Sequence, residues 1–216
     1  MKYKTVIFDL DGTLLDTLQD LTNSVNFALH SMQYPERSLA EVRMFVGNGI
    51  SKLIERAVPE GTDEQSEKKT LQIFKSHYEQ HCEDYTAPYP GVYELLSDLK
   101  EMNVHMAIVS NKADFAVKKL CKKYFSDYIS LAIGECDGVR KKPAPDTVFA
   151  AIAQLNAQQE STVYIGDSDV DIETARNAKI DSVSVTWGFR DEDFLLEKGA
   201  SVCVDSAVKL KSLLLK

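Results

Sequence analysis

Two carboxylates stand two residues apart at the end of the first apolar segment of the chain, TVIFDLDG (5–12). Alternate side chains of an extended backbone share one face, so Asp9 and Asp11 are expected on the same side, roughly 6–7 Å apart. In open α/β sheets, ligands bind where the strands end. Taken alone, such a pair more often marks a polar strand end followed by a turn at Gly12.

Polar side chains also stand at the ends of later apolar segments. They are Ser110 and Asn111 after VHMAIV (104–109), Lys142 in the proline-stiffened loop KKPAPD (141–146), and Asp167 after TVYIG (162–166). If these segments are parallel strands of one sheet, their carboxyl ends meet at one edge. The side chains would then converge on a single crevice with Asp9 and Asp11.

Asp171 follows Asp167 at the helical spacing i, i+4. A helix that begins just after Gly166 would carry both carboxylates on its N-terminal face, where the helix dipole favours negative charge. Capping of that helix is the other role open in this stretch, and Ser168 or Asp169 suits it.

Several carboxylates in one cleft repel one another strongly at reduced dielectric, and Lys142 alone does not compensate them. Oxygen ligands with room for water and a phosphate fit Mg²⁺, which takes one or two carboxylates plus substrate oxygens. Zinc fits less well, because the candidate ligands include no nearby Cys or His. The sequence therefore predicts Mg²⁺ as the cofactor.

The elements that must position these residues alternate along the chain. Apolar, β-branched segments predict buried strands at 5–12, 104–111, 128–135, 162–169 and 181–188. Segments with helical spacing lie at 92–103, 113–125, 145–156 and 171–179. This order predicts right-handed βαβ units, and hence an α/β fold with a Rossmann-like parallel sheet and helices on both faces.

About ninety residues separate the first two predicted strands, which is too many for a single crossover. Residues 17–84 contain helical patterns broken at proline and glycine, and no convincing strand. We therefore expect an inserted all-helical subdomain at 17–84. The catalytic core would be formed by 1–16 and 85–216, and TAPYPG (86–91) would serve as the second hinge.

In chain order, DLDGTLLDT, SNK, KKPAPD and GDSDVD resemble the four motifs of the haloacid dehalogenase superfamily of phosphatases, over nearly the whole chain. The insertion between the first two motifs resembles the helical cap of that superfamily. The resemblance implies Mg²⁺-dependent hydrolysis of a small phosphorylated metabolite through an aspartyl-phosphate intermediate.

The resemblance also implies a role for each motif residue. Asp9 would be the nucleophile, and Asp11 the general acid and base that protonates the leaving oxygen and then activates water. Ser110 and Asn111 would hold and orient the phosphoryl oxygens, and Lys142 would neutralise charge on Asp9 and on the phosphoryl group. These residue types suit phosphoryl transfer, which depends mainly on positioning and charge compensation.

The implied metal ligands are Asp9, the backbone carbonyl of Asp11, and Asp167. Asp171 would act either as a ligand through water or as a group that supports the ligands. Gly12 would let backbone N–H groups approach the phosphate closely, although an ordinary turn glycine is equally consistent.

Specificity is expected to come from the cap. Within the superfamily, VGNGISKLIERAV (46–58) and WGFR (187–190) resemble segments of phosphoglycolate phosphatases, and related pyrophosphatases and sugar phosphatases share parts of them. Arg43 and the loop Gly47-Asn48-Gly49 are therefore expected to bind the substrate. A pyrophosphatase, a sugar phosphatase or a phosphomutase is the alternative. Trp187 and Phe189 either line the site or pack the end of the last predicted strand.

A non-enzymatic phosphoryl switch of the receiver type also combines acidic residues, a hydroxyl and a lysine on a parallel sheet. It fits less well, because an acid two residues beyond the acceptor, as Asp11 is, favours turnover. The 216 residues carry a net charge of −8, which disfavours nucleic acid or an anionic membrane as a partner. No signal-like or 18-residue apolar run occurs, which predicts a cytoplasmic location. The sequence leaves the oligomeric state unknown.

Overall fold

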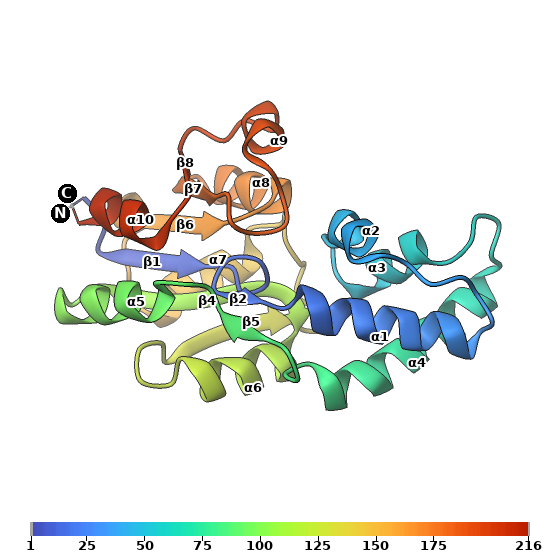
Figure 1. The fold of residues 1–216 in the computed structure, drawn as a ribbon. Helices are drawn as coiled ribbons and strands as arrows, with labels where there is room; N and C mark the ends of the chain where they lie inside the picture. Colours follow the sequence, from blue (N-terminus) through green and yellow to red (C-terminus); the bar gives the residue numbers. More distant parts are fainter. Residues whose placement is uncertain (1, 216) are drawn as a thin grey trace. The chain divides into compact units, whose positions relative to one another are not determined.

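The computed structural model describes residues 2–215, which form two compact units (Figure 1). The core unit comprises the described residues up to Leu15 and from Pro88 onward. The helical unit comprises Asp16–Ala87. The short strands β2 (Leu15–Asp16) and β3 (Ala87–Pro88) pair with each other where the chain passes from one unit to the other.

Six parallel strands form the sheet of the core unit, in the order β5-β4-β1-β6-β7-β8. Their bounds are β1 Thr5–Phe8, β4 His105–Ala113, β5 Leu131–Glu135, β6 Thr162–Gly166, β7 Asp181–Val185 and β8 Cys203–Val204. From β1 the chain builds the sheet to one side through β4 and β5, and then to the other side through β6 to β8. The order thus reverses at β1, which is where sheets of this kind bind their ligands.

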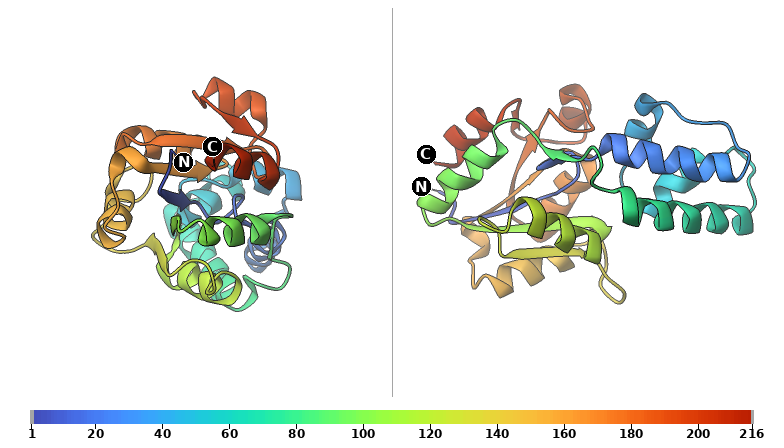
Figure 2. Two further views of the ribbon diagram at one scale, coloured as in Figure 1. Left: turned by 90° about the vertical axis from the view of Figure 1, so that its left-hand side faces the viewer. Right: turned by 60° about the horizontal axis from the view of Figure 1, so that its bottom comes forward.

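Both faces of the sheet are buried. In β1, Val6 and Phe8 belong to the apolar cluster on one face and Ile7 to the cluster on the other. The first face is covered by α5 (Val92–Glu101), α6 (Asp114–Tyr124) and α10 (Ala207–Leu214), and the second by α7 (Asp146–Gln154) and α8 (Asp169–Ala178) (Figure 2). The near-continuous apolar runs of the strands are explained by this double cover. The predicted Rossmann-like α/β fold is confirmed.

Two short helices complete the core unit. A 3₁₀ turn, η1 (Gln159–Ser161), leads into β6, and α9 (Glu192–Glu197) packs Leu195 against Ile172 of α8.

The helical unit consists of α1 (Leu18–Ser31), α2 (Leu39–Phe45), α3 (Ile50–Ala57) and α4 (Glu64–His81). Helices α1 and α4 lie side by side, and α2 and α3 pack against them around a separate apolar core. Fully buried side chains of that core include Val25, Leu29, Val42 and Phe74. The unit therefore has a hydrophobic core of its own.

Asp20, near the start of α1, ties together the two ends of the helical unit. It is 1% exposed, and its Oδ1 accepts a hydrogen bond from the Tyr85 N–H at 3.0 Å. Its Oδ2 accepts from the N–H of Thr86 at 2.9 Å and from the hydroxyl of the same residue at 2.8 Å. A buried carboxylate with this many donors is well satisfied, so it holds the entering and leaving segments next to each other.

The strand and helix bounds differ from prediction mainly at the carboxyl edge of the sheet. Strands β1, β6 and β7 end at residues 8, 166 and 185, which is three or four residues before the ends that the sequence predicts. In contrast, β4 runs on to residue 113 and α8 begins at 169. Strand β8 and helices α9 and α10 were not predicted, because each is short and lacks a strong period.

None of the helices within residues 2–215 combines the length and the apolar character needed to cross a bilayer.

Candidate active site

The site lies at the carboxyl ends of the three central strands, β4, β1 and β6. Asp9 follows β1 directly, and its N–H donates to the Ile165 carbonyl of β6 at 2.8 Å. Ser110 lies in β4 and is 4% exposed, and Asp167 follows β6 and is 1% exposed. Parallel pairing therefore brings together residues that are far apart in the sequence.

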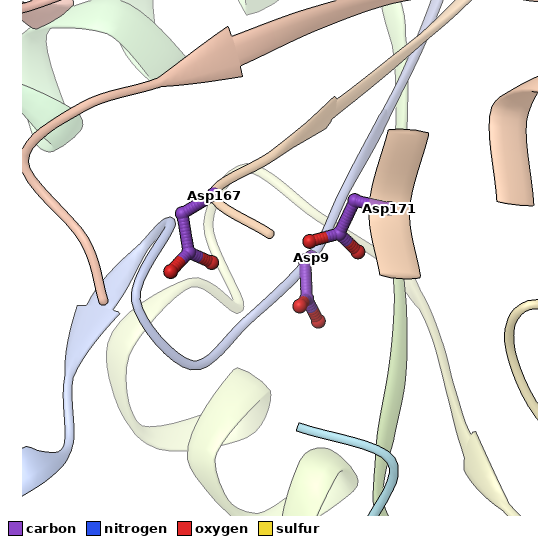
Figure 3. Close-up of side chains that lie close together, drawn as sticks. All are labelled: Asp9, Asp167 and Asp171. Carbon is purple, nitrogen blue, oxygen red and sulfur yellow. The ribbon is translucent and has the colours of Figure 1, made fainter. Parts of the chain in front are cut away.

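Asp9, Asp167 and Asp171 form a buried carboxylate trio (Figure 3). One oxygen from each lies within 4.8 Å of the other two. In Figure 3, Asp9 and Asp167 project from the loops that follow their strands, and Asp171 projects from the first turn of α8. Three carboxylates this close and this buried require positive charge to be stable together.

Lys142 provides part of that charge. Its Nζ lies 2.7 Å from Asp171 Oδ1 and 3.0 Å from Asp9 Oδ2, and it donates to the Tyr164 hydroxyl at 2.9 Å. That hydroxyl in turn donates to the Val109 carbonyl at 2.9 Å. The role of Tyr164 is not apparent from the sequence, because a tyrosine inside an apolar strand gives no sign of a polar role.

Asn111 holds the main chain of Lys142. Its Nδ2 donates to the Lys142 carbonyl at 2.9 Å, and its Oδ1 accepts from the Lys142 N–H at 2.8 Å. Both ends of the amide are thus engaged by one residue of the loop. In the structure Asn111 orients Lys142, the residue that pairs with Asp9, and its role toward phosphoryl oxygens stays a prediction.

Burial controls the electrostatics of these groups. Burial raises the pKa of Asp9 to about 7, Lys142 opposes this rise, and Asp171 and Asp11 add to it. Burial, followed by the nearby Asp171 and Asp9, raises the pKa of Asp167 well above its usual range. Burial alone would lower the pKa of Lys142, but Asp171 and Asp9 outweigh it and the pKa lies well above its usual value. The raised pKa values favour the charged form of Lys142 and disfavour the ionised forms of Asp9 and Asp167.

Asp167 is fixed by two donors and by the space around it. Its Oδ1 accepts from the Thr13 hydroxyl at 3.1 Å, and its Oδ2 accepts from the Phe189 N–H at 2.7 Å. A Cβ at Gly12, where φ is +82°, would lie 2.3 Å from Asp167 Oδ2. Gly12 is thus required because its missing side chain makes room for the carboxylate. Trp187 is linked to Asp167 through Thr13, because its indole N–H donates to the Thr13 carbonyl at 3.0 Å.

Asp171 is engaged at both oxygens. Ser168 caps α8, and its N–H and hydroxyl donate to Asp171 Oδ2 at 3.1 and 2.6 Å, which forms a capping box. The other oxygen pairs with Lys142. Residue 171 therefore supports the lysine as well as standing in the trio, and Ser168 has the capping role that the sequence suggested.

The Asp11 side chain stands apart from the trio and pairs with a second buried lysine. Lys112 Nζ lies 2.9 Å from Asp11 Oδ1 and 3.1 Å from Oδ2. The role of Lys112 is not apparent from the sequence, because the predicted strand ends at residue 111.

An irregularity in β4 brings these residues to the site. The five residues of β4 from Val109 to Ala113 lie opposite only three residues of β5, from Ile133 to Glu135. Such bulges re-aim side chains near active sites. Here the irregular stretch contains Ser110, Asn111 and Lys112.

The net charge of the site favours binding of one divalent cation. Four carboxylates, those of Asp9, Asp11, Asp167 and Asp171, face the two buried ammonium groups of Lys112 and Lys142. Full ionisation would therefore leave a surplus of two negative charges at a site whose donors are oxygens. That donor set and charge fit Mg²⁺.

The predicted cap residues lie in the helical unit. The loop between α2 and α3 has three successive residues with positive φ, namely Gly47 at 123°, Asn48 at 65° and Gly49 at 87°. Arg56 of α3 donates to the carbonyls of Phe45 at 2.7 Å and Gly47 at 3.3 Å, which fixes this loop. The role of Arg56 was not apparent from the sequence, because its partners are main-chain groups.

Arg43 lies in the last turn of α2, just before this loop.

Comparison with known proteins identifies the family. The model of the haloacid dehalogenase-like hydrolases matches residues 6–185. The chain belongs to this family. The predicted assignment to the haloacid dehalogenase-type phosphatases is thereby confirmed, and with it the prediction that the protein is a hydrolase.

Individual members of the family resemble nearly the whole chain. The phosphoglycolate phosphatase of Colwellia psychrerythraea is 34% identical over 210 residues, which cover 94% of this chain and 93% of the relative. That of Pseudomonas savastanoi pv. phaseolicola is 32% identical over 213 residues, covering 96% and 78%. The crystal structure of a candidate phosphoglycolate phosphatase from Lactobacillus delbrueckii superimposes with a TM-score of 0.95 at 36% identity, covering 99% of each chain.

Proposed function

We propose that this member of the haloacid dehalogenase-like hydrolases is a Mg²⁺-dependent phosphatase, with phosphoglycolate as its preferred substrate. The observation that carries the proposal is the setting of Asp9, a buried carboxylate at the point where the strand order reverses, 3.0 Å from the Lys142 ammonium. The choice of substrate is supported by the relatives, which are named as phosphoglycolate phosphatases.

In the first half-reaction, a carboxylate oxygen of Asp9 attacks phosphorus and the bond to the leaving oxygen breaks. Asp11 gives its proton to that oxygen, so the alcohol leaves neutral and Asp9 carries the phosphoryl group. Lys142 and the Ser110 hydroxyl stabilise the charge on the phosphoryl oxygens. This assignment is supported by the position of Ser110 on β4, the strand next to β1.

In the second half-reaction, Asp11 takes a proton from water as the water oxygen attacks phosphorus. The bond to Asp9 breaks, inorganic phosphate leaves, and Asp9 returns to its starting state. Asp11 is then protonated again for the next turnover, so the proton count closes over the cycle.

Asp9, Asp167 and the backbone carbonyl of Asp11 are proposed to hold the cation. Mg²⁺ bound there supplies positive charge for the phosphoryl oxygens and cancels the surplus of the carboxylates. We assign Asp171 to positioning Lys142, because Ser168 and Lys142 already use both of its oxygens.

The helical unit is proposed to act as a cap, which residues 17–84 form. Within this cap, Arg43 and Gly47-Asn48-Gly49 bind the carboxylate of phosphoglycolate. Gly47 and Gly49 have no side chains, so an anion can approach the main-chain N–H groups of this loop closely. Anchoring of the loop carbonyls by Arg56 favours this arrangement, because it keeps those acceptors away from the anion.

The test is release of inorganic phosphate from a panel that contains phosphoglycolate, pyrophosphate, sugar phosphates and 4-nitrophenyl phosphate. We expect the highest kcat/KM with phosphoglycolate, loss of activity with EDTA, and recovery on addition of Mg²⁺. Preference for pyrophosphate or a sugar phosphate would replace the substrate. Isomerisation without phosphate release would indicate a mutase, and one phosphoryl group taken up without turnover would indicate a switch.

A further inference from the structure

The mechanism above gives no role to Lys112, although this lysine forms a buried ion pair with Asp11. Residues 11 and 112 lie 101 positions apart in the chain, and the Lys112 side chain is only 3% exposed. Within residues 2–215, Lys112 is the one side chain that donates hydrogen bonds to the Asp11 carboxylate, and it reaches both oxygens.

Each other carboxylate of the site is fixed by two partners. Asp9 accepts from the Leu10 N–H at 2.7 Å and pairs with Lys142. Asp167 and Asp171 are likewise held by pairs of groups on separate elements. The orientation of the Asp11 carboxylate therefore depends on a single side chain.

Proton transfer depends strongly on that orientation. A general acid must lie within about 2.6–3.2 Å of the oxygen that it protonates. A displacement of about 1 Å can lower the rate by roughly a hundredfold. Lys112, a cation held in place by the sheet, is suited to set the plane of the carboxylate without exchanging protons itself.

The sheet places Lys112 through a close backbone contact. Its carbonyl oxygen would lie 2.7 Å from a Cβ at Gly134 of β5, and that Cβ would lie 2.4 Å from Asp114 Cα. The Gly134 N–H also donates to Asp114 Oδ1 at 3.0 Å. The irregular part of β4 can thus hold Lys112 here only because β5 has no side chain at residue 134.

We propose that Lys112 is a positioning residue, which orients the Asp11 carboxylate for proton transfer in both half-reactions. The proposal rests on the proposed phosphatase function and adds to it a residue outside the assigned catalytic groups. In each half-reaction the proton moves between Asp11 and the leaving oxygen or water, and Lys112 keeps its own protons throughout.

The test compares aryl phosphates whose leaving groups differ in their need for a proton. For Lys112→Met, we expect kcat/KM to fall by about a hundredfold with phenyl phosphate and by less than about tenfold with 2,4-dinitrophenyl phosphate. In Lys112→Arg, which keeps the positive charge, kcat/KM with phenyl phosphate should regain at least a tenth of what Lys112→Met loses relative to the wild type. Lys209→Met, which removes an exposed lysine paired with Asp205, is the matched control and should leave both rates unchanged.

A double variant separates positioning from substrate binding. If Lys112 acts through Asp11, adding Lys112→Met to Asp11→Asn should cost less than about threefold more. Equal losses with both aryl phosphates, together with additive losses in the double variant, would mean that Lys112 binds the phosphoryl group and would overturn the proposal. Unchanged kcat/KM with a lower Tm would also overturn it, because the pair would then serve only folding.

Gly134→Ala keeps the test available if Lys112→Met does not fold, because it moves the Lys112 main chain and retains the lysine. The same dependence on the leaving group is expected, and its absence in a folded Gly134→Ala protein would count against the proposal. A wild-type protein that hydrolyses no phosphate ester would instead refute the proposed function itself.

Discussion

The carboxyl edge of the sheet and the loop between α2 and α3 differ in how they present their polar groups. At the sheet edge, charged side chains such as Asp9, Asp167 and Lys142 are almost fully buried and satisfied by fixed partners. In the loop around Asn48, the distinctive feature is main-chain conformation at partly exposed residues. The first arrangement suits a fixed chemical step, and the second suits recognition that can vary from one substrate to another.

The difference also affects stability. Burying carboxylates together at the sheet edge is costly, and the raised pKa of Asp9 is a sign of that cost. The loop between α2 and α3 buries no comparable charge. Substitutions at the sheet edge should therefore change both turnover and stability, whereas substitutions in the loop should change mainly the choice of substrate.

The largest effect is expected for Asp9→Asn. The amide keeps the shape of the side chain but cannot form the covalent intermediate, so kcat should fall on the order of 10⁴-fold or more. The Tm of the metal-free protein should rise, because one of the buried carboxylates is neutralised. Asp181→Asn, at an exposed carboxylate that pairs with Lys2, is the control. Near-normal kcat in Asp9→Asn would remove this residue from the mechanism.

Lys142→Ala comes next. Loss of the ammonium removes stabilisation of the phosphoryl oxygens, and kcat should fall by roughly 10²–10³-fold. Removing one partner of a buried charge group should also lower the Tm of the metal-free protein. The neighbouring Lys141→Ala, which removes a half-exposed pair with Glu135, should have little effect on either quantity. A change confined to KM would limit Lys142 to substrate binding.

A smaller and more selective effect is expected in the loop between α2 and α3. Asn48→Gly retains the positive φ but removes the amide, so kcat/KM for phosphoglycolate should fall by about tenfold and that for 4-nitrophenyl phosphate by less than about twofold. Asn103→Gly, at another positive φ of 57°, controls for the loss of an asparagine from such a conformation. Equal losses with both substrates would assign the loop to general closure rather than recognition.

The smallest effect concerns pH and metal. The folded-state pKa of Asp9 is about 7, above its ordinary value, so stability from this group is present at low pH and is lost as pH rises through 7. From pH 6 to pH 8 the metal-free protein should lose about 1 kcal/mol from this group, which is about 2–4 °C in Tm. Because Mg²⁺ binds the ionised form, its stabilising effect should be larger at pH 8. A Tm shift on Mg²⁺ addition that is equal at both pH values would contradict this.

The sheet was predictable because β-branched runs ending in polar residues specify buried parallel strands. The acidic and basic groups at their ends, such as Asp9 and Lys142, could be proposed to converge because parallel strands share one edge. Lys112 and Tyr164 could not be found in this way, since the role of one depends on an irregularity in β4 and that of the other on a partner in a distant loop. The local pattern of apolar and polar residues is enough to predict the order of the strands and helices. Register shifts and tertiary hydrogen bonds cannot be predicted from it, because they depend on the assembled sheet.

The hydrogen bonds that Asp20 accepts from Tyr85 and Thr86 have a consequence for how chains of this kind can evolve. Because Asp20 holds Tyr85 and Thr86, the helical unit begins and ends at neighbouring points. In the core unit, the Tyr89 N–H donates to the Leu14 carbonyl at 3.1 Å, so the two core ends are neighbours as well. An inserted segment with adjacent ends can be exchanged for another without moving the strands that flank it. Given the proposed role of the helical unit in recognition, we expect its replacement to alter the substrate range while the groups at the sheet edge stay unchanged.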